Sequence, residues 1–165
     1  MIFLKQEKSR ERLCADLVLM QRGIEKELAE QERFIKQFQL FVQTEGESLP
    51  IIDLFSCPTA IFGRGGVLYR ANRALMDNTG LQAGEILTGK INFLGRVTDE
   101  NYAILEAAEG IFYGNTALLS RLSFPLELFC KGWGFPVTGD YHNALLFPLP
   151  DENGRIPFGV IMLMK

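Results

Sequence analysis

The feature that most constrains this chain is a charged, proline-free stretch near its N-terminus, residues 5–47. It carries eight basic and nine acidic side chains, and Gly23 is its only glycine before Gly46. Proline and glycine are the residues that disfavour helices most, so their near absence predicts one long helix. Gly46 and Pro50 then favour its end, because glycine suits the left-handed C-terminal position and proline disfavours helix in the residue before it.

The apolar residues of this stretch recur at spacings of three, four and seven, which is typical of a helix with one apolar face. Written as heptads they fill most core positions of a coiled coil, but Glu27 and Gln31 interrupt the seam. We therefore expect a helix that forms a homodimer, with the alternative that it folds back over an open sheet of its own domain. The residues expected to pair are Leu13, Leu17, Met20, Ile24, Leu28, Phe34 and Phe38.

Composition indicates one globular domain after the helix. The chain is 47% hydrophobic and 22% charged, and none of its apolar runs is long enough to cross a bilayer. A length of 165 residues suits one core, so we expect a helix at 1–47 and a domain at 48–165, with no membrane contact. The net charge of -3 disfavours direct binding to nucleic acid, and the lack of a signal peptide at Met1 favours the cytoplasm.

The domain begins with β-like runs and short helical ones. A glycine-rich turn at 63–66 separates the apolar runs 60–62 and 67–70, which predicts a β-hairpin. Asn72 can accept hydrogen bonds from the free amides of a following helix, which Gly80 would end.

The rest of the domain reads as one longer helix followed by strands. Thr98 or Asp99 could cap a helix from 100 to 112, whose apolar residues follow helical spacing with one polar lapse. Residues 151–154 form the clearest turn signal. The runs predicted as strands are 116–124, 126–131, 143–149 and 158–164.

This order of elements over residues 49–165 resembles the PAS family. The local motifs that carry the resemblance are Cys57-Pro58, Arg64-Gly65-Gly66-Val67, Tyr69-Arg70-Ala71-Asn72, Thr79-Gly80 and Phe147-Pro148-Leu149. The resemblance implies an α+β fold with a five-stranded antiparallel sheet, helices on one face, and a long N-terminal helix before it. It also implies a non-catalytic sensory or regulatory module of a signalling or transcription-control protein, with a downstream effector domain absent from this chain.

The resemblance leaves the cofactor unknown. Residues 89–99 are similar to the segment that carries the photoreactive cysteine of flavin-binding light sensors, but they contain no cysteine. Asn143 is the only amide side chain offered on the last strands, which gives flavin little to bind. His142 is the only histidine and precedes an apolar strand rather than lying on the long helix, so a haem ligand has little support.

A pocket for a small apolar ligand is the sharper functional hypothesis, because thirteen phenylalanines and one tryptophan are many for a chain of this size. The alternative for each of them is ordinary core packing. By position in the family fold, the residues expected to border the pocket are Phe93, Tyr102, Leu105, Leu118 and Leu122, with Trp133 and His142 at its mouth.

Two other functions stay open. One is a protein-interaction scaffold with a filled core and no ligand. The other is a small enzyme that pairs Cys57 or Cys130 with His142, although no nucleophile motif surrounds either cysteine. With Cys14 the cysteines number three, far apart and without a CxxC pair, so neither a disulfide framework nor a metal site is expected.

Overall fold

The computed structural model describes residues 2–45, 50–130 and 139–165, and no side chain is described at 2–9, 37, 38, 40–45, 50 and 51. The chain forms two compact units, Met1–Phe41 and Val42–Lys165. In the described ranges, no helix combines the length and the apolar character that a membrane span requires.

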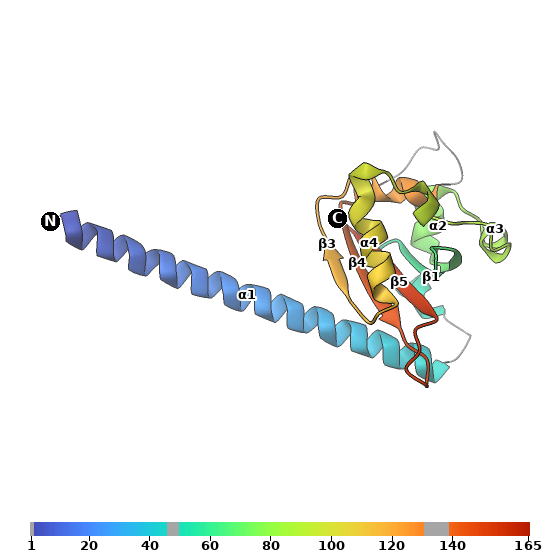
Figure 1. The fold of residues 1–165 in the computed structure, drawn as a ribbon, viewed down its shortest axis with the longest axis horizontal. Helices are drawn as coiled ribbons and strands as arrows, with labels where there is room; N and C mark the ends of the chain where they lie inside the picture. The colour runs from blue at the N-terminus through green and yellow to red at the C-terminus, as the bar shows by residue number, and fades with distance from the viewer. Residues whose placement is uncertain (1, 46–49, 131–138) are drawn as a thin grey trace. The chain divides into compact units, whose positions relative to one another are not determined.

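The predicted N-terminal helix is present as α1, Ile2–Glu45 (Figure 1). Gly23 lies in its interior, where glycine costs up to about 1 kcal/mol relative to alanine. Most of the other residues are leucine, glutamate, lysine, arginine and glutamine, which are good helix formers. The predicted end of the helix, at Glu47, falls on residues 46–49 and so lies outside the described residues.

The second unit is built on an antiparallel sheet of five strands in the order β2-β1-β5-β4-β3. Strands β4 and β5 pair along their full lengths, from Asn143 opposite Met164 to Leu149 opposite Phe158. The predicted α+β class and five-stranded antiparallel sheet are confirmed. The strands are β1 Thr59–Gly63, β2 Leu68–Ala71, β3 Ala117–Leu119, β4 Asn143–Leu149 and β5 Phe158–Met164.

The three shorter α-helices all lie in the connection between β2 and β3. Figure 1 shows α4 lying along the sheet, and its buried residues Ile104, Ala108 and Ile111 follow the spacing of a helix with one buried face. The helices are α2 Arg73–Thr79, α3 Ala83–Leu87 and α4 Tyr102–Ile111, with 3-10 turns η1 Pro50–Leu54, η2 Leu94–Arg96, η3 Asp99–Asn101 and η4 Pro125–Phe129.

The side chain of Asn72 joins three parts of this unit. Its Oδ1 accepts the backbone N–H groups of Thr59 and Leu75, both at 2.9 Å, so it caps α2 as predicted and also holds β1. Its Nδ2 donates to the carbonyl oxygens of Ile52 at 3.0 Å and Cys57 at 2.8 Å. Asn72 is fully buried, so these bonds replace water for both ends of the amide.

Two predicted strands differ from the structure. The run 126–131 was predicted as a strand, but Pro125–Phe129 forms the 3-10 turn η4, because an apolar run alone does not separate buried strand from buried helix and Pro125 favours a helical first turn. The run 116–124 keeps only the three residues of β3 as strand. Arg121 and Phe124 have φ values of 58° and 48°, which an extended strand does not allow.

The cap predicted for the longer helix is also only partly present. Thr98 occupies the N-cap position of η3, but its side chain makes no capping hydrogen bond, and Asp99 lies inside η3. The α-helical part therefore starts at Tyr102, two residues later than predicted.

The turn between β1 and β2 depends on Gly66. Its φ is +89°, and a Cβ there would lie 2.5 Å from Cγ of Leu94. Its carbonyl accepts the N–H of Phe93 at 3.2 Å, so the turn packs directly on the segment that leads into η2. Neighbouring Gly65 also has a positive φ, +85°, but has open space around it.

Replacing Asn72 with alanine should destabilise the domain by about 3 kcal/mol or more, since several buried polar groups lose their partner at once. Asn72→Asp keeps an acceptor oxygen but turns its second oxygen toward the carbonyl oxygens of Ile52 and Cys57, so it should cost at least as much as alanine. The measurement is urea unfolding followed by circular dichroism, with Asn153→Ala in an exposed turn as the control. An Asn72→Ala change within about 0.5 kcal/mol of wild type would contradict this role.

Gly65→Ala and Gly66→Ala separate backbone strain from steric overlap. Gly65→Ala should cost about 1 kcal/mol, because only the left-handed backbone opposes it. Gly66→Ala should cost about 3 kcal/mol, because overlap with Leu94 adds to the same strain. Thermal unfolding of both variants measures the difference. Equal losses of stability would show that overlap with Leu94 does not contribute to the cost.

Candidate functional site

Phe93, one of the residues expected to border a pocket, lies in a cluster of buried aromatic rings. Phe62, from β1, meets Phe93 edge to face with 5.1 Å between ring centroids, and Phe93 stacks on Phe129 at 4.8 Å. All three side chains are fully buried. Phe93 is therefore part of the packed core. Core packing was the alternative to a pocket position for each aromatic residue.

The other residues expected around a pocket are not gathered in one place. Leu122 is buried in the same core as Phe93, whereas Tyr102 and Leu118 are about half exposed. Leu105 lines the surface hollow described next. Trp133 lies outside the described residues, and His142 lies at the surface.

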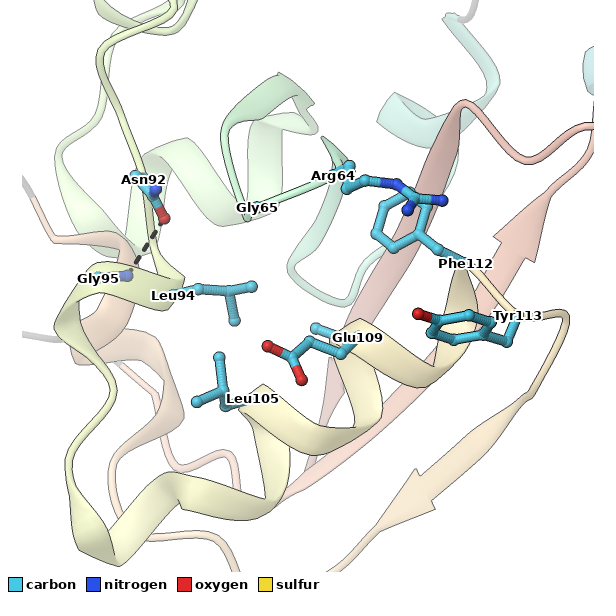
Figure 2. Close-up of a pocket in the computed structure, with 10 residues that line it drawn as sticks. Arg64, Gly65, Asn92, Leu94, Gly95, Leu105, Glu109, Phe112 and Tyr113 are labelled. Atoms are coloured by element: carbon cyan, nitrogen blue, oxygen red, sulfur yellow. Dashed lines mark hydrogen bonds between the residues drawn. The ribbon is translucent and has the colours of Figure 1, made fainter.

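A hollow of about 620 Å³ lies on the outside of α4 (Figure 2). The turn after β1, the segment around η2 and one side of α4 enclose it. Figure 2 shows Leu94 and Leu105 pointing toward each other, with Glu109 beside them on the side of Tyr113. The lining residues are Arg64, Gly65, Asn92, Leu94, Gly95, Leu105, Ala108, Glu109, Phe112 and Tyr113.

The charges at this hollow have opposite signs. The guanidinium of Arg64 lies over the ring of Phe112, with 5.2 Å from Cζ to the ring centroid, which is a cation–π contact. Glu109 extends from α4 toward the opening. Such a hollow can hold a small molecule with an apolar body, an acceptor that faces arginine and a donor that faces the carboxylate.

Arg64 and Glu109 were not among the predicted site residues. Glu109 left a signal in the sequence, because it is the polar lapse in the apolar spacing of the helix from 100 to 112. Arg64 left a weaker one, as a charged residue in a glycine-rich turn, where solvated charge is common.

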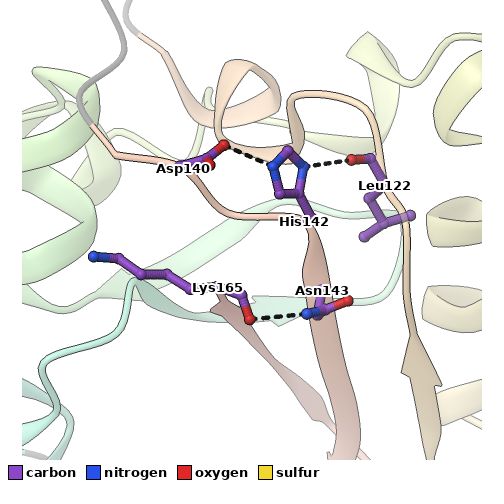
Figure 3. Close-up of polar contacts among 5 residues, drawn as sticks. All are labelled: Leu122, Asp140, His142, Asn143 and Lys165. Carbon is purple, nitrogen blue, oxygen red and sulfur yellow. Dashed lines mark hydrogen bonds and ion pairs between the residues drawn. The ribbon is translucent and has the colours of Figure 1, made fainter.

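His142 forms a surface contact between two loops (Figure 3). Its Nε2 lies 2.6 Å from Oδ1 of Asp140, and its Nδ1 lies 3.3 Å from the carbonyl oxygen of Leu122. The side chain is 51% exposed. Both ring nitrogens thus face oxygen acceptors and not a thiol.

The cysteines have other neighbours than His142. Sγ of Cys57 lies 3.8 Å from Oγ1 of Thr59, and Sγ of Cys130 donates to the carbonyl of Leu126 at 3.5 Å. Burial is the main cause that raises the pKa of the Cys130 thiol, and Glu127 adds to it. A raised pKa leaves less of the reactive thiolate at neutral pH. The structure therefore gives no support to a Cys–His pair at either cysteine.

The apolar stripe of α1 is the second candidate site. Leu13, Leu17, Met20, Ile24 and Leu28 are 49 to 65% exposed, although each is a large apolar side chain. Phe34 is half-buried, and the side chain of Phe38 lies outside the described residues. Exposed apolar patches of this kind mark interaction surfaces.

In the described ranges, no group of three or more histidine, cysteine, aspartate or glutamate side chains could hold a metal ion.

Neither a protein-family model nor a curated protein matches this sequence. Similar structures exist among solved proteins. A sensory box sensor histidine kinase from Vibrio cholerae is 12% identical with a TM-score of 0.47, over 81% of this chain and 95% of that one. A LOV protein from Rhodobacter sphaeroides is 13% identical with a TM-score of 0.48, over 78% and 66%.

The PAS domain of BvgS from Bordetella pertussis is 14% identical with a TM-score of 0.41, over 70% of this chain and 78% of that one. With TM-scores below 0.5 and identities of 12 to 14%, these likenesses carry no argument about this chain. The architecture itself is the one that the sequence resemblance implied: a five-stranded antiparallel sheet with its helices inserted between β2 and β3, after a long N-terminal helix. The strand order and the placement of the helices thus agree with the predicted PAS-like architecture.

Proposed function

We propose that this chain is a non-catalytic regulatory module, in which a PAS-like domain is joined to a helix that pairs with a second copy of the chain. The exposed stripe of α1 carries this proposal. Its apolar residues recur with the spacing of helix–helix interfaces. Charged residues such as Arg22 and Lys26 lie on the rest of the helix, together with the exposed apolar side chains of Val18 and Leu19. A second identical helix offers the matching surface.

The size of the stripe suits a reversible dimer. Burying an aliphatic side chain that is about half exposed gains roughly 1 kcal/mol, so five side chains on each of two helices gain about 10 kcal/mol. Association costs roughly 4 to 15 kcal/mol. The two terms are of similar size, so pairing would respond to modest changes in the rest of the chain, which suits a regulatory role.

A small-molecule ligand is a further part of the proposal, with a different location from the one expected. Packing of Phe62, Phe93 and Phe129 supports a filled interior, which favours the scaffold alternative for the core. The hollow beside α4 is where a ligand could bind, between Arg64 and Glu109. Signalling, transcription control and an attached effector domain remain predictions from the family resemblance.

Native mass spectrometry of the purified full chain tests both parts. We expect a dimer at micromolar concentration, and any retained small molecule would add mass to each protomer. Ile24→Gln should shift the population to monomer, because it places an amide in the apolar stripe. Leu87→Gln, at an exposed position of the domain, is the control and should leave the dimer unchanged.

A wild-type chain that stays monomeric at the highest concentration reached would overturn the pairing proposal. A dimer that Ile24→Gln leaves intact would show that another surface pairs.

A further inference from the structure

The apolar stripe of α1 stops following a heptad repeat after Ile24. Leu13, Leu17, Met20 and Ile24 are separated by four, three and four residues, as in a heptad seam. The heptad would continue with Glu27. The apolar side chain that follows is instead Leu28, which is 49% exposed.

Helix geometry alone does not choose between Glu27 and Leu28. At about 100° per residue, the two lie on opposite sides of the centre line of the preceding stripe, each about 50° away. Side-chain chemistry does choose, because a carboxylate in a dry interface loses its hydration without gaining a partner. A leucine side chain has no such hydration to lose, and packing it removes apolar surface from water.

We propose that α1 of a second copy packs on a seam formed by Leu13, Leu17, Met20, Ile24 and Leu28, with Glu27 at the solvent-facing edge. This inference rests on the pairing proposed above and assigns its register. Two consecutive four-residue steps, 20 to 24 and 24 to 28, amount to a stutter in the heptad pattern, and a stutter locally unwinds a coiled coil. The two helices therefore run straighter beyond Ile24 than before it.

The sequence beyond Ile24 agrees with this register. The spacing from Leu13 to Ile24 repeats from Ile24 through Leu28 and Gln31 to Ile35, an 11-residue period that does not wind into a left-handed supercoil.

Gly23 directly precedes Ile24, the residue at which the two four-residue steps meet. A glycine inside a helix restrains the backbone less than any other residue does, and an added Cβ there would have no atom within 4 Å. The helix is thus easiest to unwind locally next to the predicted stutter.

Two neighbouring substitutions distinguish the registers. In the full chain, Leu28→Gln should weaken the dimer at least about tenfold, and Glu27→Leu should change its dissociation constant less than about threefold. Sedimentation equilibrium at several concentrations gives these constants. Leu19→Gln is the matched control, because Leu19 is 66% exposed on the opposite side of α1 and should have no effect. Far-ultraviolet circular dichroism checks that each variant keeps its helix.

The outcomes separate the two levels of the proposal. A continuous heptad predicts the reverse, with Glu27→Leu tightening the dimer at least about tenfold and Leu28→Gln having little effect, which would overturn the register but keep the pairing. If Leu17→Gln, which belongs to both seams, also leaves the dissociation constant unchanged, or if wild type does not associate, the pairing itself is wrong.

Discussion

The buried amide of Asn72 is the interaction on which the domain depends. A single side chain accepts two backbone N–H groups and donates to two carbonyls, so η1, β1 and α2 share one set of hydrogen bonds. Such a group is costly if any partner is missing, and it therefore fixes where the neighbouring segments lie. The sheet order places β1 between β2 and β5, so this local constraint reaches the centre of the sheet.

Buried aromatic rings make up part of the domain's core. The stacked and edge-to-face rings of Phe62, Phe93 and Phe129 occupy the region where the family resemblance implied a ligand. The polar groups that remain accessible, such as Arg64 and Glu109, lie on the outer side of α4. The apolar stripe of α1 is a second accessible surface with an unusual composition, because its large apolar side chains are about half exposed.

Much of the fold could be predicted because local signals agreed with each other. Strands β4 and β5 were predicted with the bounds that the structure has, since long apolar runs ended at clear turn residues. Asn72 and Gly80 were found as caps for the same reason. The turn η4 could not be predicted, because buried helical and extended apolar runs look alike in sequence.

The site was harder to predict than the fold because it depends on which segments meet. No spacing in the sequence brings Arg64 to Phe112, and only the hairpin turn packing beside α4 does so. The apolar stripe was recognisable, but a heptad frame placed Glu27 in its core. Leu28, the next apolar side chain, is also exposed, and the choice between the two positions rests on the chemistry of their side chains.

The central claim is that two copies meet along α1, and a distance between the two helices tests it most directly. A nitroxide at Arg22→Cys, in a chain whose native cysteines are replaced, lies near the middle of the stripe but on its far side. Pulsed electron resonance should then give a narrow distance between protomers on the order of 25 Å, because packed helices lie about 8 to 10 Å apart. A spectrum with no distance between protomers would contradict the account.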